Sequence, residues 1–174
     1  MVNKENFNTD NVSYTEMTRE FYRAFKQSIP DKNSRPSLAE DTIPEDRLHL
    51  KMNLIAEEFS ELVEAVYGKE AAEVIRESYK KAVEKDDKNR DIVEAADATA
   101  DLRVVLDGFD IETNIPTEKV FNEVFRSNMS KLDSDGNPIL SDGTTAPLNK
   151  IMKSDNYFAP DIKSVLFSDK WFCC

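Results

Sequence analysis

Six acidic residues have the types and spacing to do chemistry together, and they fall into two short patterns. The patterns are Glu-Glu-x-x-Glu and Glu-x-x-Asp-x-x-x-Asp, made by Glu57, Glu58 and Glu61 and by Glu94, Asp97 and Asp101. At about 100° per residue, positions three, four and seven apart share one stripe of a helix. The spacing therefore predicts two carboxylate clusters, each on one face of its own helix.

The second pattern lies in residues 91–106, a stretch rich in Ala and Val that no Gly or Pro interrupts. Val93, Val104 and Val105 flank the acidic stripe. A helix that is apolar nearly all round is expected to be buried, and buried carboxylates need a partner. A divalent metal ion would supply that partner. The alternative is that the three acids lie on a solvated edge.

The first pattern lies in a helix expected over residues 45–67, and its acids fall roughly opposite an apolar face. That face is made by Leu48, Met52, Ile55, Phe59, Leu62, Val63 and Val66. Taken alone, the three glutamates are the ordinary solvated face of an amphipathic helix. No lysine stands where it could pair with them, so they repel one another. This repulsion favours a shared cation.

Two such helices lying antiparallel would form a box of carboxylates. Hard oxygen ligands without His or Cys suit Mg²⁺ or Mn²⁺ and disfavour zinc or copper. A metal ion held in this way keeps positions open for water and for substrate phosphates. The two patterns therefore predict a site for a phosphate-bearing substrate.

The rest of the sequence predicts an all-α helical bundle in a single domain. Its 174 residues include four glycines and seven prolines, most of the prolines lying between helix-like segments. The expected helices cover residues 11–27, 45–67, 69–85, 91–107, 116–131 and 161–167, with Gly108 ending the fourth. Residues 30–45 form a long loop that is a candidate for substrate contact. Turn signals around residues 139–140 predict a small hairpin or extended arm. The domain covers residues 11–168, between a disordered segment at 1–10 and a tail at 169–174.

Charge and composition exclude several classes of protein. The net charge of −11 argues against binding a nucleic-acid polymer, which needs a basic surface. No apolar run is long enough to span a membrane and the first residues are polar, so we expect a cytoplasmic protein (host cytoplasm if viral) with no membrane partner. His49 is the one histidine, which excludes sites needing two. Cys173 and Cys174 are adjacent and terminal, so a disulfide between them cannot stabilise the fold.

Two motifs and two later segments carry a family resemblance. Residues 54–62 (LIAEEFSEL) and 94–102 (EAADATADL) hold the two acidic patterns, and the later segments are 127–131 and 153–161. Together they resemble the MazG-like all-α NTP pyrophosphohydrolases, which include dimeric dUTPases and phosphoribosyl-ATP pyrophosphohydrolases. The later segments are similar to those of phage and bacterial members. The resemblance covers roughly residues 14–166. The 32 residues between Glu61 and Glu94 are slightly more than the family pattern, which bears on substrate specificity.

The resemblance implies hydrolysis of a nucleoside triphosphate to the monophosphate and pyrophosphate, with Mg²⁺ or Mn²⁺. The implied metal ligands are Glu58, Glu61, Glu94 and Asp97. Glu57 is a further ligand or orients the attacking water, and Asp101 is a weaker candidate for either role. A homodimer or homotetramer is also implied.

Four later residues are implied to hold phosphates or sugar: Asn128, Lys131, Lys153 and Tyr157. Asn128 and Lys131 could instead mark a helix C-terminus that favours a cation, and Tyr157 could belong to the core. The resemblance favours a purine deoxynucleotide such as dGTP. The alternatives are dUTP, dCTP or phosphoribosyl-ATP as substrate, or a non-catalytic acidic helical module that binds a protein partner or Ca²⁺.

Overall fold

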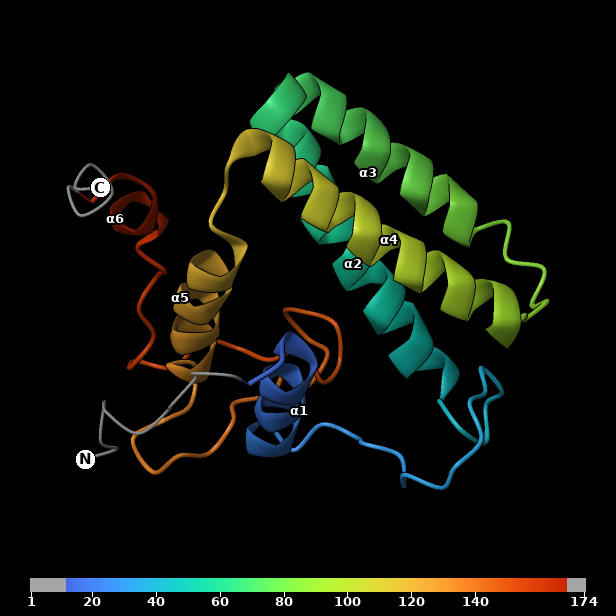
Figure 1. Cartoon of the computed structure of the whole chain (residues 1–174). Helices are drawn as coiled ribbons and strands as arrows, with labels where there is room; N and C mark the ends of the chain where they lie inside the picture. The colour runs from blue at the N-terminus through green and yellow to red at the C-terminus, as the bar shows by residue number, and fades with distance from the viewer. Residues whose placement is uncertain (1–11, 169–174) are drawn as a thin grey trace. The chain divides into compact units, whose positions relative to one another are not determined.

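A computed structural model describes residues 12–168, and the regular structure of these residues is entirely helical (Figure 1). The helices are α1 (Tyr14–Ala24), α2 (Glu45–Tyr67), α3 (Lys69–Val83), α4 (Ile92–Thr113), α5 (Thr117–Met129) and α6 (Ile162–Phe167). The predicted all-α fold is confirmed. The expected disorder of residues 1–10 and the tail at 169–174 lie outside the described residues.

Most helix ends follow the local signals in the sequence. The Ser13 hydroxyl accepts a hydrogen bond from the Glu16 N–H at the start of α1. Gly68 lies between α2 and α3 with φ of +93°, a conformation that favours glycine, and its N–H donates to the Glu64 carbonyl. This single residue allows α2 to reverse directly into α3.

The end of α4 differs from the prediction, because the helix passes through Gly108 and continues to Thr113. It ends where Asn114 adopts φ of +57°. The N–H groups of Asn114 and Ile115 donate to the carbonyls of Ile111 and Asp110, which closes the last turn. Asparagine tolerates the left-handed conformation, so it ends the helix here in the role that glycine often takes.

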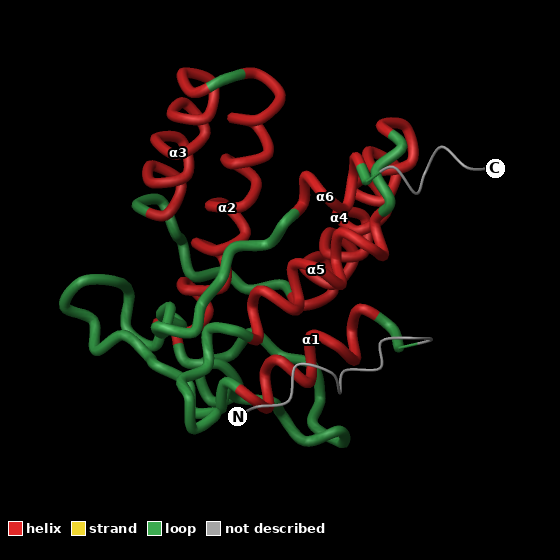
Figure 2. The backbone as a smooth tube through the Cα atoms, turned by 90° about the vertical axis from the view of Figure 1, so that its left-hand side faces the viewer, coloured by secondary structure: helices red, strands yellow, loops and turns green. Residues whose placement is uncertain are grey.

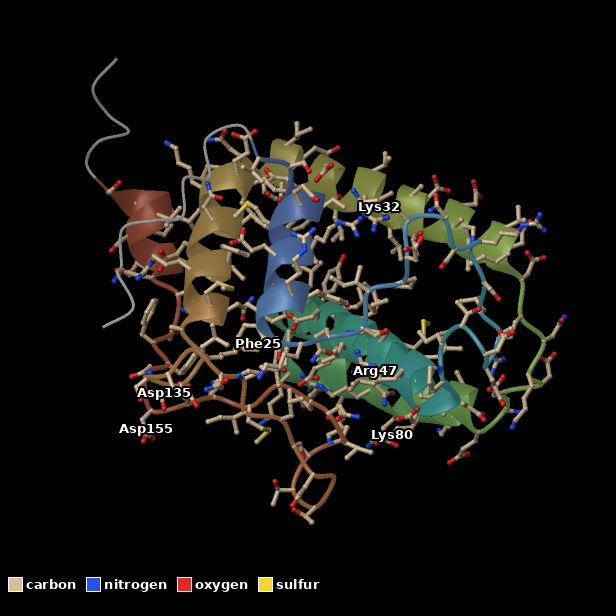
Figure 3. All side chains as sticks on the ribbon, turned by 90° about the horizontal axis from the view of Figure 1, so that it is seen from below. Phe25, Lys32, Arg47, Lys80, Asp135 and Asp155 are labelled. Carbon is tan, nitrogen blue, oxygen red and sulfur yellow. The ribbon has the colours of Figure 1, made fainter. Side chains whose placement is uncertain are left out.

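The chain divides into two compact units, and the division falls within α4, after Ala98. In the second unit, Lys32–Ala98, α2 packs along α3, and Leu50, Ser60 and Ala72 are buried. The first unit holds the remaining described residues, with α5 packed against α1 and α6. Its core includes Phe25, which is fully buried (Figure 3).

Helix α4 has no buried residue, although its apolar composition predicted burial. Val93, Val104 and Ile111 are 71%, 68% and 78% exposed. Helical periodicity tells which residues share a stripe, but not which element covers it, and the described residues leave this stripe uncovered. The prediction of a buried α4 is therefore wrong for the isolated chain, and its acids lie on an exposed surface.

Long connections link α1 to α2 and α5 to α6, and Figure 2 draws the loops in green. The residues between α1 and α2 form no regular structure, as expected for the loop at 30–45. Between α5 and α6, Leu140 and Ile151 form an isolated antiparallel bridge, so the predicted arm is extended with a minimal pairing. Among the described residues, no helix combines the length and the apolar character that a membrane crossing requires.

Candidate functional site

Within the first acidic cluster, Glu58 lies on the side of α2 that faces away from α3, whereas Glu57 lines a cavity between the two helices. Ser60 is 1% exposed and donates a hydrogen bond to the Glu57 carbonyl at 2.7 Å. Glu58 precedes Ser60 by two residues and lies about 200° round the helix from it. Glu57, Glu58 and Glu61 are all exposed. The packing of α2 on α3 therefore directs Glu58 into solvent.

The second cluster begins in the first turn of α4. The Asp91 carboxylate accepts hydrogen bonds from the N–H groups of Val93 and Glu94, at 2.9 and 3.1 Å, and so caps the helix. Glu94 and Asp97, one turn apart, are both exposed. Negative charge is favourable at a helix N-terminus, which stabilises this position for Glu94. Asp101 continues the stripe and is also exposed.

The described structure does not draw the predicted ligands together to coordinating distance. Among the described residues, one group of three acidic or histidine side chains has its ligand atoms within 4.8 Å of one another, and it contains none of the predicted ligands. Carboxylates repel one another unless a cation bridges them. The predicted set is therefore an exposed pair of clusters, one on α2 and one on α4.

The group that does come together is Glu45, His49 and Asp86, which sequence reasoning missed. His49 Nε2 lies 3.4 Å from Glu45 Oε1 and 3.9 Å from Asp86 Oδ2. Glu45 and His49 are four residues apart, a spacing from which their contact could have been predicted. Asp86 comes from the turn after α3, and only tertiary structure places it beside them.

Two cations already neutralise this group. Arg90 donates to both Asp86 carboxylate oxygens at 2.7 Å, and Lys88 lies 3.3 Å from Glu45. The Arg90 hydrogen bonds, followed by one from the Lys88 backbone N–H, hold the pKa of Asp86 well below its ordinary value. A hydrogen bond from Lys88 is the main cause of the lowered pKa of Glu45. The group acts as an ion-pair cluster that fixes the start of α2 to the turn before α4.

The structure pairs the four predicted phosphate- or sugar-binding residues. Lys131 Nζ donates to Asn128 Oδ1 at 2.7 Å, and Lys153 Nζ lies 4.3 Å from the centroid of the half-buried Tyr157 ring. The Ser154 hydroxyl donates to the Leu132 carbonyl at 2.8 Å, which joins the end of α5 to the segment that carries Lys153. Two lysines, an amide and a phenol thus occupy neighbouring segments, a chemistry suited to phosphate oxygens.

Each compact unit contains a cavity that the sequence did not predict. One of about 510 Å³ lies between α2 and α3, with Glu57, Arg76 and Tyr79 in its lining. The Tyr79 hydroxyl is buried without a hydrogen-bond partner in the described structure, and burial raises its pKa. Arg76 is paired with Glu64 at 2.7 Å, so its charge is already balanced. The other cavity, of about 520 Å³, lies in the first unit between α1, α4 and α5.

Comparison with known proteins agrees with the fold and with the two motifs. The sequence profile of a family described as phosphoribosyl-ATP pyrophosphohydrolase matches residues 18–128, a range that contains both acidic patterns. A search of curated proteins finds no match. A solved structure from Exiguobacterium sp. 255-15, named as a candidate NTP pyrophosphohydrolase, is 24% identical. It matches over 89% of this chain and 94% of that chain with a TM-score of 0.64, which shows a shared fold.

Proposed function

The chain belongs to the phosphoribosyl-ATP pyrophosphohydrolase family, and we propose that it hydrolyses a deoxynucleoside triphosphate to the monophosphate and pyrophosphate with Mg²⁺ or Mn²⁺. It is a pyrophosphohydrolase of the MazG-like all-α class. The observation that carries the proposal is the pair of exposed acidic clusters on α2 and α4, both inside the region that matches the family. Family membership also favours an enzyme over a non-catalytic acidic module.

We assign metal binding to Glu58, Glu61, Glu94 and Asp97. Their carboxylates are hard oxygen donors, and a set without His or Cys fits Mg²⁺ or Mn²⁺. When bound, such an ion neutralises phosphate charge and lowers the pKa of a coordinated water. Glu57 adjoins this set and is assigned to orient the attacking water, and Asp101 supports the same stripe one turn later. None of these roles needs a covalent nucleophile.

Lys131 and Lys153 are assigned to the phosphates, with Asn128 and Tyr157 as hydrogen-bonding partners for phosphate or sugar. The pairs that these residues form in the structure hold both ammonium groups in defined places before substrate binds. A positioned charge loses less entropy on binding than a freely rotating one, so this arrangement supports the assignment.

The proposed substrate is a purine deoxynucleotide such as dGTP, by resemblance to phage and bacterial members. The alternatives are dUTP, dCTP and phosphoribosyl-ATP. Helix α3 and the turn after it hold the extra length between the two motifs, and the lining of the α2–α3 cavity includes Arg76 and Tyr79 from α3. This part of the chain is where we expect the choice among these substrates to differ from that of relatives.

We further propose that the active form is a homodimer or homotetramer, whose subunits cover the exposed stripe of α4. Val93, Val104 and Ile111 recur on one side of α4 and are each more than two-thirds exposed. An exposed apolar stripe of this kind marks an association surface. We propose also that residues 11–168 act as one catalytic domain, since the family match crosses both compact units. The proposed location of this domain is the cytoplasm.

The test is product analysis on all common dNTPs and NTPs and on phosphoribosyl-ATP, with Mg²⁺, with Mn²⁺ and with EDTA. Pyrophosphate and orthophosphate are quantified separately, and Asp97→Asn serves as the inactive control. We expect metal-dependent pyrophosphate release, greatest with dGTP. Orthophosphate as the first product, or equal release by Asp97→Asn, would overturn the proposal. Preference for another nucleotide would correct the substrate and leave the reaction in place.

A further inference from the structure

The cavity of about 520 Å³ in the first unit combines aromatic rings with arginines. Tyr14, Tyr22 and Phe121 supply the rings, and Arg19 and Arg103 supply the cations. Ser28, from the segment that follows α1, adds a hydroxyl. Sites for small ligands commonly occupy about 300–1,000 Å³ and combine apolar walls with a few polar groups. The size and lining of this cavity therefore fit a small aromatic ligand.

The aromatic wall is built from two helices. The Tyr14 ring of α1 and the Phe121 ring of α5 have centroids 4.5 Å apart and planes inclined by 33°. Burial is the largest cause of the raised pKa of Tyr14, so the phenol stays neutral at physiological pH. Neutral rings held by packing offer a surface on which a planar base can stack, and such stacking tolerates any base.

The two cations of the cavity differ in their partners. Arg103 donates to the Thr99 carbonyl at 2.8 Å, and no carboxylate pairs with it among the described residues. Arg19 is paired with Glu16 at 3.3 Å, and Asp107 is an acid in the lining. In a chain with a net charge of −11, an arginine without a counter-ion beside aromatic rings is suited to a phosphate group.

This cavity lies on the opposite face of α4 from the acidic stripe. Arg103 follows Asp101 by two residues, so it lies about 200° round the helix from it. Leu106, also in the lining, lies about 140° from Asp101. A ligand in the cavity therefore lies behind the acidic stripe, where Arg103 is available to its phosphate and Asp107 is the one carboxylate of the lining.

We propose that this cavity binds a nucleotide, with its base against the Tyr14, Tyr22 and Phe121 rings and its phosphate on Arg103, at a site separate from the carboxylate stripe. Ser28 is placed to bind the sugar. Because the recognition rests on arginine, binding needs no divalent ion. The inference concerns binding alone and stands apart from the proposed reaction.

The test is calorimetry of the full chain in EDTA with nucleoside monophosphates. The parent nucleosides and inorganic phosphate are titrated separately, to resolve the base from the phosphate. The variants are Arg103→Gln, Asp97→Asn and Arg23→Gln, the last removing an exposed arginine of α1 that is outside the lining. We expect a monophosphate to bind in EDTA, with affinity unchanged in Asp97→Asn and Arg23→Gln and reduced at least about tenfold in Arg103→Gln.

Three outcomes would overturn the inference: no binding in EDTA, equal binding of inorganic phosphate, or full affinity in Arg103→Gln. Arg103 is exposed, so its substitution leaves the fold intact, and circular dichroism of the variant verifies this. Pyrophosphate release by the same preparation tests the proposed reaction separately. Loss of one property with the other kept would then show which of the two proposals fails.

Discussion

The Lys153 ammonium nitrogen lies 4.3 Å from the centroid of the Tyr157 ring, on an exposed segment that Ser154 anchors to the end of α5. Exposed cation–π contacts contribute only about 0.5–1 kcal/mol, so this contact positions the lysine more than it stabilises the fold. The Lys153 side chain remains exposed to solvent. Its charge is therefore positioned and accessible, as a residue that binds phosphate requires.

Lys153→Met should raise KM for the nucleotide roughly tenfold and change kcat little, because a hydrogen bond to a charged group contributes about 1.5–3 kcal/mol. Lys153→Arg, which keeps the charge, should retain most of the affinity. Steady-state kinetics with the preferred nucleotide makes the comparison, with Lys163→Met, an exposed lysine of α6, as the control. An unchanged KM in Lys153→Met would remove Lys153 from the substrate site.

Glu61→Gln and Asp97→Asn should each reduce metal-dependent pyrophosphate release by at least about a hundredfold, on the scale seen when one electrostatic partner of a transition state is removed. Both residues are exposed, so thermal stability should stay close to that of the wild type. Glu84→Gln, an exposed acid after α3, is the matched control and should remain active. Activity retained in either ligand variant would show that its carboxylate does not hold the metal.

The helix bounds were largely readable from the sequence. Capping and turn signals mark their own positions, which is why α2 and α3 start and end within two residues of the expected ends. The end of α4 was missed because a glycine permits a left-handed turn without requiring one. Asn114 took that conformation six residues later, just ahead of Pro116.

The surroundings of the site could not be predicted from the sequence in the same way. Periodicity placed Glu94 and Asp97 on one stripe, but burial of that stripe depends on elements far apart in sequence or on another subunit. The same holds for the Glu45–His49–Asp86 group and for the cavity beside Arg103. A residue from a distant segment completes each of these sites, and no local sequence pattern predicts that contact.

Ser127→Ala should lower the free energy of unfolding by about 1–2 kcal/mol. Ser127 is 2% exposed, and its hydroxyl donates to the Phe158 carbonyl at 2.8 Å. Removal of the hydroxyl leaves a carbonyl without its partner, which has a cost in this range. Urea denaturation gives the value, and Ser134→Ala, in the exposed turn after α5, should change it by less than about 0.5 kcal/mol. Equal stability of the two variants would mean that water replaces the lost bond.

Val104→Lys should weaken self-association, if the exposed stripe of α4 is where subunits meet. A lysine in an apolar contact must lose its hydration without gaining a partner. Sedimentation equilibrium over a range of concentrations measures the effect. Val74→Lys, at a position of α3 that is 63% exposed, is the control and should associate as the wild type does. Loss of association in both variants would indicate a general charge effect, and loss in neither would place the contact elsewhere.

Asp86→Asn should lower the melting temperature at neutral pH, and the difference from the wild type should shrink in acid. Arg90 holds the folded-state pKa of Asp86 below the unfolded value of about 3.9. A group with a depressed folded pKa contributes its full stability above the unfolded pKa and loses it as the pH falls through the folded pKa. The difference in melting temperature should therefore begin to shrink at about pH 4 and shrink further as the pH falls towards the folded pKa. Asp155→Asn, an exposed aspartate labelled in Figure 3, is the control and should melt with the wild type at neutral pH. A difference that stays constant down to acid pH would show that Asp86 stabilises the fold by packing alone.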